Sequence, residues 1–119
     1  MKYEAPEPKT DTEIKQIISY PEYSFKEKIN SALSAIYYSQ DIEFCADIII
    51  YFFNNSNLEE NLFIKNLFET FYGIRRSIYK LQEIIEMLND YKLSENKYAE
   101  EFDATIEVLM EYKDMFKLK

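Results

Sequence analysis

The sequence contains no histidine and no tryptophan, and it has only one glycine and one cysteine among its 119 residues. Histidine is the usual general acid or base near neutral pH and a common metal ligand. Glycine-rich loops are what bind phosphates and dinucleotides in many nucleotide sites. The chain therefore lacks most of the usual catalytic groups. Its composition favours a protein that is not an enzyme and that holds neither a metal ion nor a cofactor.

Acidic and aromatic residues are abundant instead. The chain has 22 Asp and Glu against 14 Lys and Arg, a formal net charge of -8, and 17% of its residues are aromatic. A negative mean field repels phosphate backbones, so we expect no nucleic-acid binding, and it attracts basic proteins. The alternative is that the acidity only prevents aggregation.

The length and the apolar runs indicate one domain without a membrane segment. Residues 1–10 are expected to form a flexible lead, and residues 11–119 a single domain. No secretory leader is visible, and the longest apolar run contains Asp47 and is too short to cross a bilayer. Cys45, in that run, is expected to be a buried, unreactive thiol. The sequence thus favours a cytoplasmic protein, and we expect a monomer.

Capping residues and apolar spacing predict about six α-helices, and the first two have clear boundaries. One helix over residues 11–18 should end before Pro21, because proline forces the preceding residue out of the helical region. The next helix, over residues 25–38, begins with Ser24 and Glu27, which match the Ser-x-x-Glu capping box.

The third and fourth predicted helices follow directly. Asp41 is expected to cap a helix over residues 42–53, and Ser56 with Glu59 repeats the capping-box pattern. Gly73 lies where the fourth helix is expected to end or bend. The inner face of that helix is predicted to contain Leu58, Leu62, Phe63, Leu67, Phe71 and Ile74.

Two further helices complete the predicted fold. The fifth starts its apolar pattern at Ile78 and ends near residues 89–91, and Ser94 is the expected cap of the last. We expect antiparallel αα-hairpins, with residues 24–53 as one pair and residues 56–90 as another. The fold class is all-α with five to six helices, either a short HEAT-like solenoid or a bundle.

The last predicted helix carries the most regular polar pattern. Five acidic residues spaced three or four apart share one face of it, and we call this set the acidic strip: Glu100, Asp103, Glu107, Glu111 and Asp114. Like charges at this spacing destabilise a helix by about 0.2–0.5 kcal/mol per pair. The strip is therefore either a contact surface for a basic partner or an ordinary solvated face.

Other polar and aromatic groups give weaker signals. Residues 41–60 contain five acids and no lysine or arginine, so the same two interpretations apply to that segment. Tyr38 and Tyr72 fall at predicted helix ends, where rings are often half exposed and can serve as interface anchors. Arg75 and Arg76 form the one arginine pair, and one of them is expected to pair with nearby acids.

Part of the chain resembles a family of small helical, HEAT-repeat-like immunity proteins encoded beside bacterial contact-dependent and polymorphic toxins. The segment Ala32-Leu33-Ser34-Ala35-Ile36, followed by Tyr38, Asp41 and Phe44, is similar to the opening helix and turn of that family. Residues 67–74 and 99–109 are similar to its central helix and its acidic last helix. The resemblance implies an antidote that binds a cognate toxin domain, often a nuclease, and blocks its active site.

Taken together, these observations predict a non-enzymatic immunity protein that binds a basic toxin domain. The residues expected to contact the partner are Asp103, Glu107, Glu111, Glu100, Asp41, Tyr38 and Tyr72. Two alternatives remain open at this point. One is a phage or viral inhibitor of a host nuclease, and the other is a helical adaptor or scaffold subunit with an exposed apolar patch.

Overall fold

The computed structural model describes residues 6–117, and all regular structure within that range is helical. The elements are α1 (Asp11–Ser19), α2 (Phe25–Tyr38), α3 (Ile42–Asn54), α4 (Leu58–Arg75), α5 (Leu81–Ser94), the short 3-10 helix η1 (Asn96–Tyr98) and α6 (Ala99–Lys117). The all-α fold is therefore confirmed. Of the predicted lead, residues 1–5 lie outside the described residues, and residues 6–10 precede α1 without regular structure.

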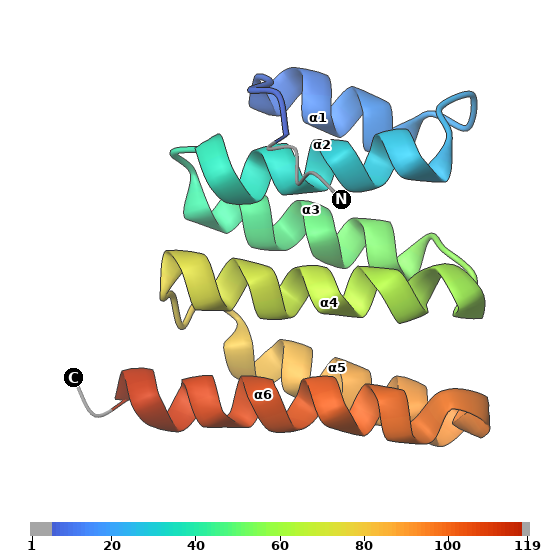
Figure 1. Cartoon of the computed structure of the whole chain (residues 1–119), viewed down its shortest axis with the longest axis vertical. Coiled ribbons are helices and arrows are strands. Elements are labelled where there is room, and N and C mark those ends of the chain that lie inside the picture. The colour runs from blue at the N-terminus through green and yellow to red at the C-terminus, as the bar shows by residue number, and fades with distance from the viewer. Residues whose placement is uncertain (1–5, 118–119) are drawn as a thin grey trace, which may run out of the picture.

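The helices form three antiparallel hairpins that stack on one another (Figure 1). α1 packs with α2, α3 with α4, and α5 with α6, while α2, α4 and α6 also contact one another in that order along a single row. The predicted pairs, residues 24–53 and 56–90, would join α2 with α3 and α4 with α5. This pairing is wrong, because α2 packs chiefly against α1, and α4 packs chiefly against α3 and α6. The result is a short solenoid-like stack in which α2, α4 and α6 run in the same direction (Figure 1).

Capping boxes start three of the helices. Thr10, Ser24 and Asn57 each accept a hydrogen bond from the backbone N–H three residues later, and the glutamate at that later position accepts one in return. The prediction that Ser56 starts α4 is wrong by one residue. The Ser56 hydroxyl instead donates to the Phe52 carbonyl at 2.7 Å, which satisfies an otherwise open acceptor at the end of α3.

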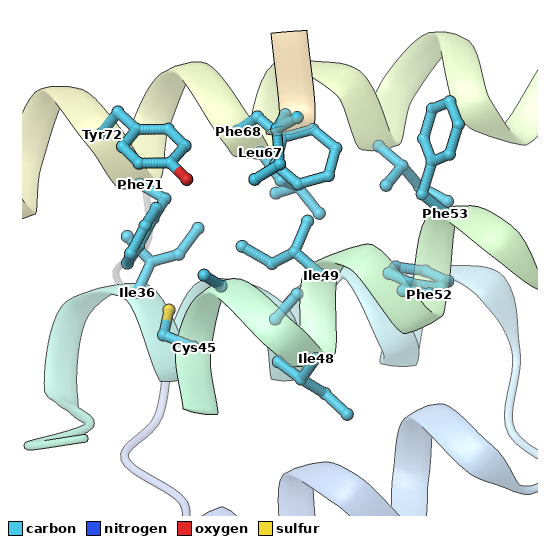
Figure 2. Close-up of a cluster of buried hydrophobic side chains, with 14 of the residues drawn as sticks. Ile36, Cys45, Ile48, Ile49, Phe52, Phe53, Leu67, Phe68, Phe71 and Tyr72 are labelled. Atoms are coloured by element: carbon cyan, nitrogen blue, oxygen red, sulfur yellow. The ribbon is translucent and has the colours of Figure 1, made fainter. Parts of the chain in front are cut away.

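Aromatic side chains from four helices meet in the core, part of which Figure 2 shows. The Phe53 ring of α3 lies 6.1 Å from Phe68 of α4, 4.9 Å from Tyr91 of α5 and 6.4 Å from Phe102 of α6, centroid to centroid. Cys45 is fully buried in the same core, as predicted (Figure 2). Burial raises the pKa of its thiol to about 12, so the thiol stays protonated at neutral pH.

α4 buries a different face from the one predicted. Leu67 and Phe71 are buried as expected, but Phe63 and Ile74 are 63% and 43% exposed. Apolar residues occur on nearly every side of α4, so periodicity alone does not select its inner face. The buried set is Asn61, Ile64, Lys65, Leu67, Phe68, Phe71 and Tyr72.

The loop between α4 and α5 departs from the predicted boundaries. α5 begins at Leu81, and Ile78 is an exposed loop residue instead of the first residue of a buried stripe. Arg76 and Lys80, on either side of that loop, have left-handed φ angles of 53° and 55°. Ser94 lies in the last turn of α5 and does not cap α6, which follows η1.

Gly73 allows a close approach of α6, and it does not end α4. The helix continues to Arg75, and a Cβ at position 73 would stand 2.8 Å from Tyr112 Oη. In a Tyr112→Phe background, we expect Gly73→Ala to raise the free energy of unfolding by about 0.5–1 kcal/mol, because alanine is the better helix former. In the wild-type background the gain should be smaller, because the Tyr112 ring must move. Urea unfolding of all four proteins measures the difference, and equal gains would contradict the close contact.

Candidate protein-binding surface

α6 places its core side and its acidic strip on opposite faces. Phe102, Ile106 and Leu109 are buried against the rest of the protein. The strip residues Glu100, Glu107, Glu111 and Asp114 are exposed, and Asp103 is partly exposed. Because successive residues turn by about 100° around a helix, this spacing produces one continuous acidic face. The strip predicted from sequence is therefore a real surface feature.

Among the residues that the structure describes, one member of the strip has an ion-pair partner. Lys92 of α5 donates from Nζ to Asp103 Oδ1 at 2.7 Å. An exposed pair of this kind contributes about 0–1 kcal/mol. Among the described residues, the other four strip carboxylates have neither an ion pair nor a hydrogen bond. Lys113 of the same helix donates to Gln82 instead of to a strip residue. The strip is left with an uncompensated negative charge.

The α5–α6 hairpin concentrates the charge of the whole protein. Residues 81–117 contain ten acidic and four basic residues, a net charge of -6 out of -8. This hairpin is the last in the stack (Figure 1), so the surface beyond it is open to solvent. Because its charge is mostly of one sign, this surface attracts a basic protein more strongly than the rest of the molecule does.

Asp41 and Tyr38 lie away from the strip, at the turn between α2 and α3. Asp41 caps α3, as predicted, because its Oδ1 accepts the Phe44 N–H at 3.0 Å. The Tyr38 ring is 44% exposed and lies 6.4 Å from the Tyr37 ring. α4 separates this turn from α6, since α2 and α3 contact α4 and α4 contacts α6. The two residues are available at the surface but do not form one cluster with the strip.

Tyr72 is wrong as a partner-binding residue, because its side chain is completely buried (Figure 2). Its hydroxyl donates to the Tyr79 carbonyl, and its ring packs edge-on against Phe71 at 4.7 Å. Burial raises the pKa of the phenol well above its usual value. Tyr72 therefore holds the α4–α5 loop from inside.

The acids of residues 41–60 are a weaker candidate surface, because several of them have structural partners. Asp47 Oδ1 lies 3.0 Å from Lys80 Nζ. The Tyr98 hydroxyl donates to Glu59 at 3.1 Å and lowers the pKa of that carboxyl. Glu60 accepts the capping-box hydrogen bond at the start of α4. Their charges are thus mostly engaged within the protein.

The arginine pair also has intramolecular contacts. Arg75 Nη1 donates to the Ile36 carbonyl at 3.0 Å, which ties the end of α2 to α4. The Arg76 guanidinium lies 5.5 Å from the centre of the Phe116 ring. Neither arginine forms an ion pair with a described residue, so the prediction that one of them pairs with nearby acids is wrong.

Sequence reasoning missed a buried polar network that joins α4 to α6. Lys65 Nζ donates to Asn66 Oδ1 and to Thr105 Oγ1, both at 3.1 Å. Thr105 Oγ1 in turn donates to Glu69 Oε2 at 2.6 Å. Burial lowers the pKa of Lys65, while the charges of Glu69 and Glu101 act in the opposite direction. The Lys-x-x-x-Glu spacing of Lys65 and Glu69 was the available signal. The network fixes the rotation of α6, and therefore the direction in which the strip faces.

The described residues contain no obvious metal or membrane feature. Within residues 6–117, no three Cys, Asp or Glu side chains are grouped to hold a metal ion. No helix in that range is long and apolar enough to span a bilayer.

Comparison of the chain with protein-family models, with curated proteins and with solved structures found no match. The functional argument therefore depends on the surface itself.

Proposed function

We propose that this chain is a non-enzymatic immunity protein that binds a basic toxin domain and covers its active site. The observation that supports the proposal is the acidic strip, in which four exposed carboxylates have no partner among the described residues. A nuclease cleft is positively charged because it binds a phosphate backbone. A helix face with this charge pattern complements such a cleft and competes with the nucleic acid for it.

The strip would act first on the rate of association. Complementary charges steer two proteins together and raise association rates toward about 10⁸–10⁹ M⁻¹ s⁻¹ at low salt. Salt screens this attraction beyond about 8–10 Å at physiological ionic strength. A salt-dependent association rate is therefore the kinetic signature that the proposal requires.

Charge reversal on the strip tests the proposal. With the partner captured from native lysate by the tagged protein and identified by mass spectrometry, we expect Glu107→Lys combined with Glu111→Lys to slow association at least about tenfold at low salt. The loss should shrink as salt is added. Surface plasmon resonance across a salt series measures both effects.

The matched control is Glu22→Lys combined with Glu43→Lys, which changes the net charge equally on exposed positions outside α6. This control should retain most of the association rate. Equal slowing by both pairs of substitutions would mean that net charge matters and that the strip is not the interface. Capture of many weak partners in place of one basic protein would also contradict the proposal.

A helical adaptor or scaffold subunit is the second candidate, and one observation favours it. Phe63 and Ile74 expose apolar side chains on α4, and exposed apolar surface often marks contacts between subunits. A scaffold of this kind should self-associate in a concentration-dependent manner, which light scattering detects. A constant monomer mass across the concentration range would exclude it.

A further inference from the structure

A row of mainly apolar side chains, some exposed and some partly exposed, lies along α2 and α4, apart from the acidic strip. On α2, Ile29, Leu33 and Tyr37 follow one another at four-residue spacing and therefore share a face. On α4, Phe63, Thr70 and Ile74 lie on the side toward α2. We call these six residues the apolar seam. Phe63, Ile74 and Tyr37 are 63%, 43% and 40% exposed, and Ile29 and Leu33 are partly exposed.

Two contacts show that the halves of the seam lie side by side. Near the starts of α2 and α4, the Phe25 and Phe63 rings meet edge-on at 6.2 Å. Near their ends, Arg75 donates to the Ile36 carbonyl at 3.0 Å. The two helices run in the same direction (Figure 1), so the stretches of α2 and α4 between these two contacts lie alongside each other. The seam is roughly 16 Å long at 1.5 Å per residue and has no charged side chain within it.

The seam and the acidic strip face the same side of the molecule. α1 contacts α3, and the Phe53 ring of α3 lies 4.9 Å from the Tyr91 ring of α5, so α1, α3 and α5 form a second row. The other side of the row formed by α2, α4 and α6 is covered by no described helix. α4 contacts α6 through Lys65 and Gly73, opposite the side that contacts α2. The free arc of α6, between its contacts with α4 and with α5, carries Glu107 and Glu111. One continuous face therefore combines apolar and acidic surface.

We propose that the apolar seam is the second half of the partner contact, so that the basic protein bound by the strip also places apolar side chains against Phe63 and Ile74. This rests on the proposed function. A second copy of the chain is the other possible occupant, but two molecules of charge -8 repel each other, whereas a basic protein is attracted.

Two synthetic helical peptides of about 20 residues test the seam, because an amphipathic helix is a common ligand of such surfaces. One carries lysines with leucines along one face, and the other has serine in place of every leucine. We expect the Lys–Leu peptide to bind more tightly. Phe63→Ser should weaken its binding about tenfold, the effect of losing one aromatic anchor, and Ile74→Ser should weaken it less. Neither substitution should change binding of the Lys–Ser peptide, as measured by isothermal titration calorimetry.

Leu93→Ser is the control, because Leu93 is 76% exposed at the end of α5 and lies outside the seam. It should leave binding of both peptides unchanged, and thermal unfolding should confirm that all three variants are folded. The seam proposal is overturned if Phe63→Ser and Leu93→Ser have the same effect, or if the wild-type protein is a dimer that Phe63→Ser converts to a monomer. A different result would contradict the proposed function. That result is unchanged binding of both peptides to the double variant Glu107→Lys with Glu111→Lys.

Discussion

Phe53→Ala is expected to lower the free energy of unfolding by about 3–5 kcal/mol, the usual cost of emptying a buried aromatic position. Phe53 is 2% exposed, and its ring contacts one ring each from α4, α5 and α6. The substitution would therefore remove a contact from three helices at once and leave a cavity between the second and third hairpins. A protein of this size typically has only about 5–15 kcal/mol of stability in total, so the loss would remove a large share of it and lower the melting temperature. Urea unfolding followed by circular dichroism measures the loss.

Phe63→Ala is the matched control, because it removes the same atoms from a side chain that is 63% exposed. We expect a loss below about 0.5–1 kcal/mol, as for most surface substitutions. Similar losses at positions 53 and 63 would contradict the assignment of Phe53 to the centre of the core.

Thr105→Val should cost about 1–3 kcal/mol, even though valine has almost the same volume as threonine. The Thr105 hydroxyl accepts a hydrogen bond from Lys65 and donates one to Glu69. Removing it leaves a buried ammonium group with one fewer partner, and an unsatisfied buried polar group carries the desolvation cost in full. Because the same network sets the rotation of α6, the variant should also bind a basic partner more weakly than its stability alone would explain.

The double variant Lys65→Met with Thr105→Val separates the lost hydrogen bond from lost packing. Replacing both Lys65 and Thr105 by apolar groups of similar shape is often close to neutral. Glu69, which loses the Thr105 donor, is partly exposed and can bind water instead. This protein should therefore regain most of the stability lost in Thr105→Val. A double variant as unstable as Thr105→Val would show that the cost comes from packing and not from the unpaired lysine. Equilibrium unfolding of the two single variants and the double variant completes the cycle.

Local signals predicted much of the fold, because they depend on neighbouring residues alone. Ser24 and Asp41 were identified as caps from their side chains, and Pro21 as the end of the first helix from its fixed geometry. Signals that depend on distant contacts failed. The inner face of α4 is set by neighbours on three sides, and the start of α5 by left-handed residues at Arg76 and Lys80, which are uncommon at residues other than glycine.

The candidate surface divides in the same way. The strip on α6 was predictable, because a spacing of three and four residues defines one helix face once the helix exists. The burial of Tyr72 was not predictable, because it depends on which face of α4 turns toward the core, and tertiary packing decides that. The seam was missed for the same reason, since Phe63 and Ile74 had been assigned to the core.

The order of the hairpins in the stack also makes the molecule an electric dipole. The α1–α2 hairpin, residues 11–38, has four acidic and three basic residues, against ten and four in residues 81–117. Successive helices along the chain run in opposite directions (Figure 1), so their macrodipoles largely cancel and the side chains determine the field. That field has one negative pole, at the α5–α6 end. A basic protein approaching from any direction would be rotated toward this pole before any atoms touch. The two molecules would therefore be oriented before their surfaces come into contact.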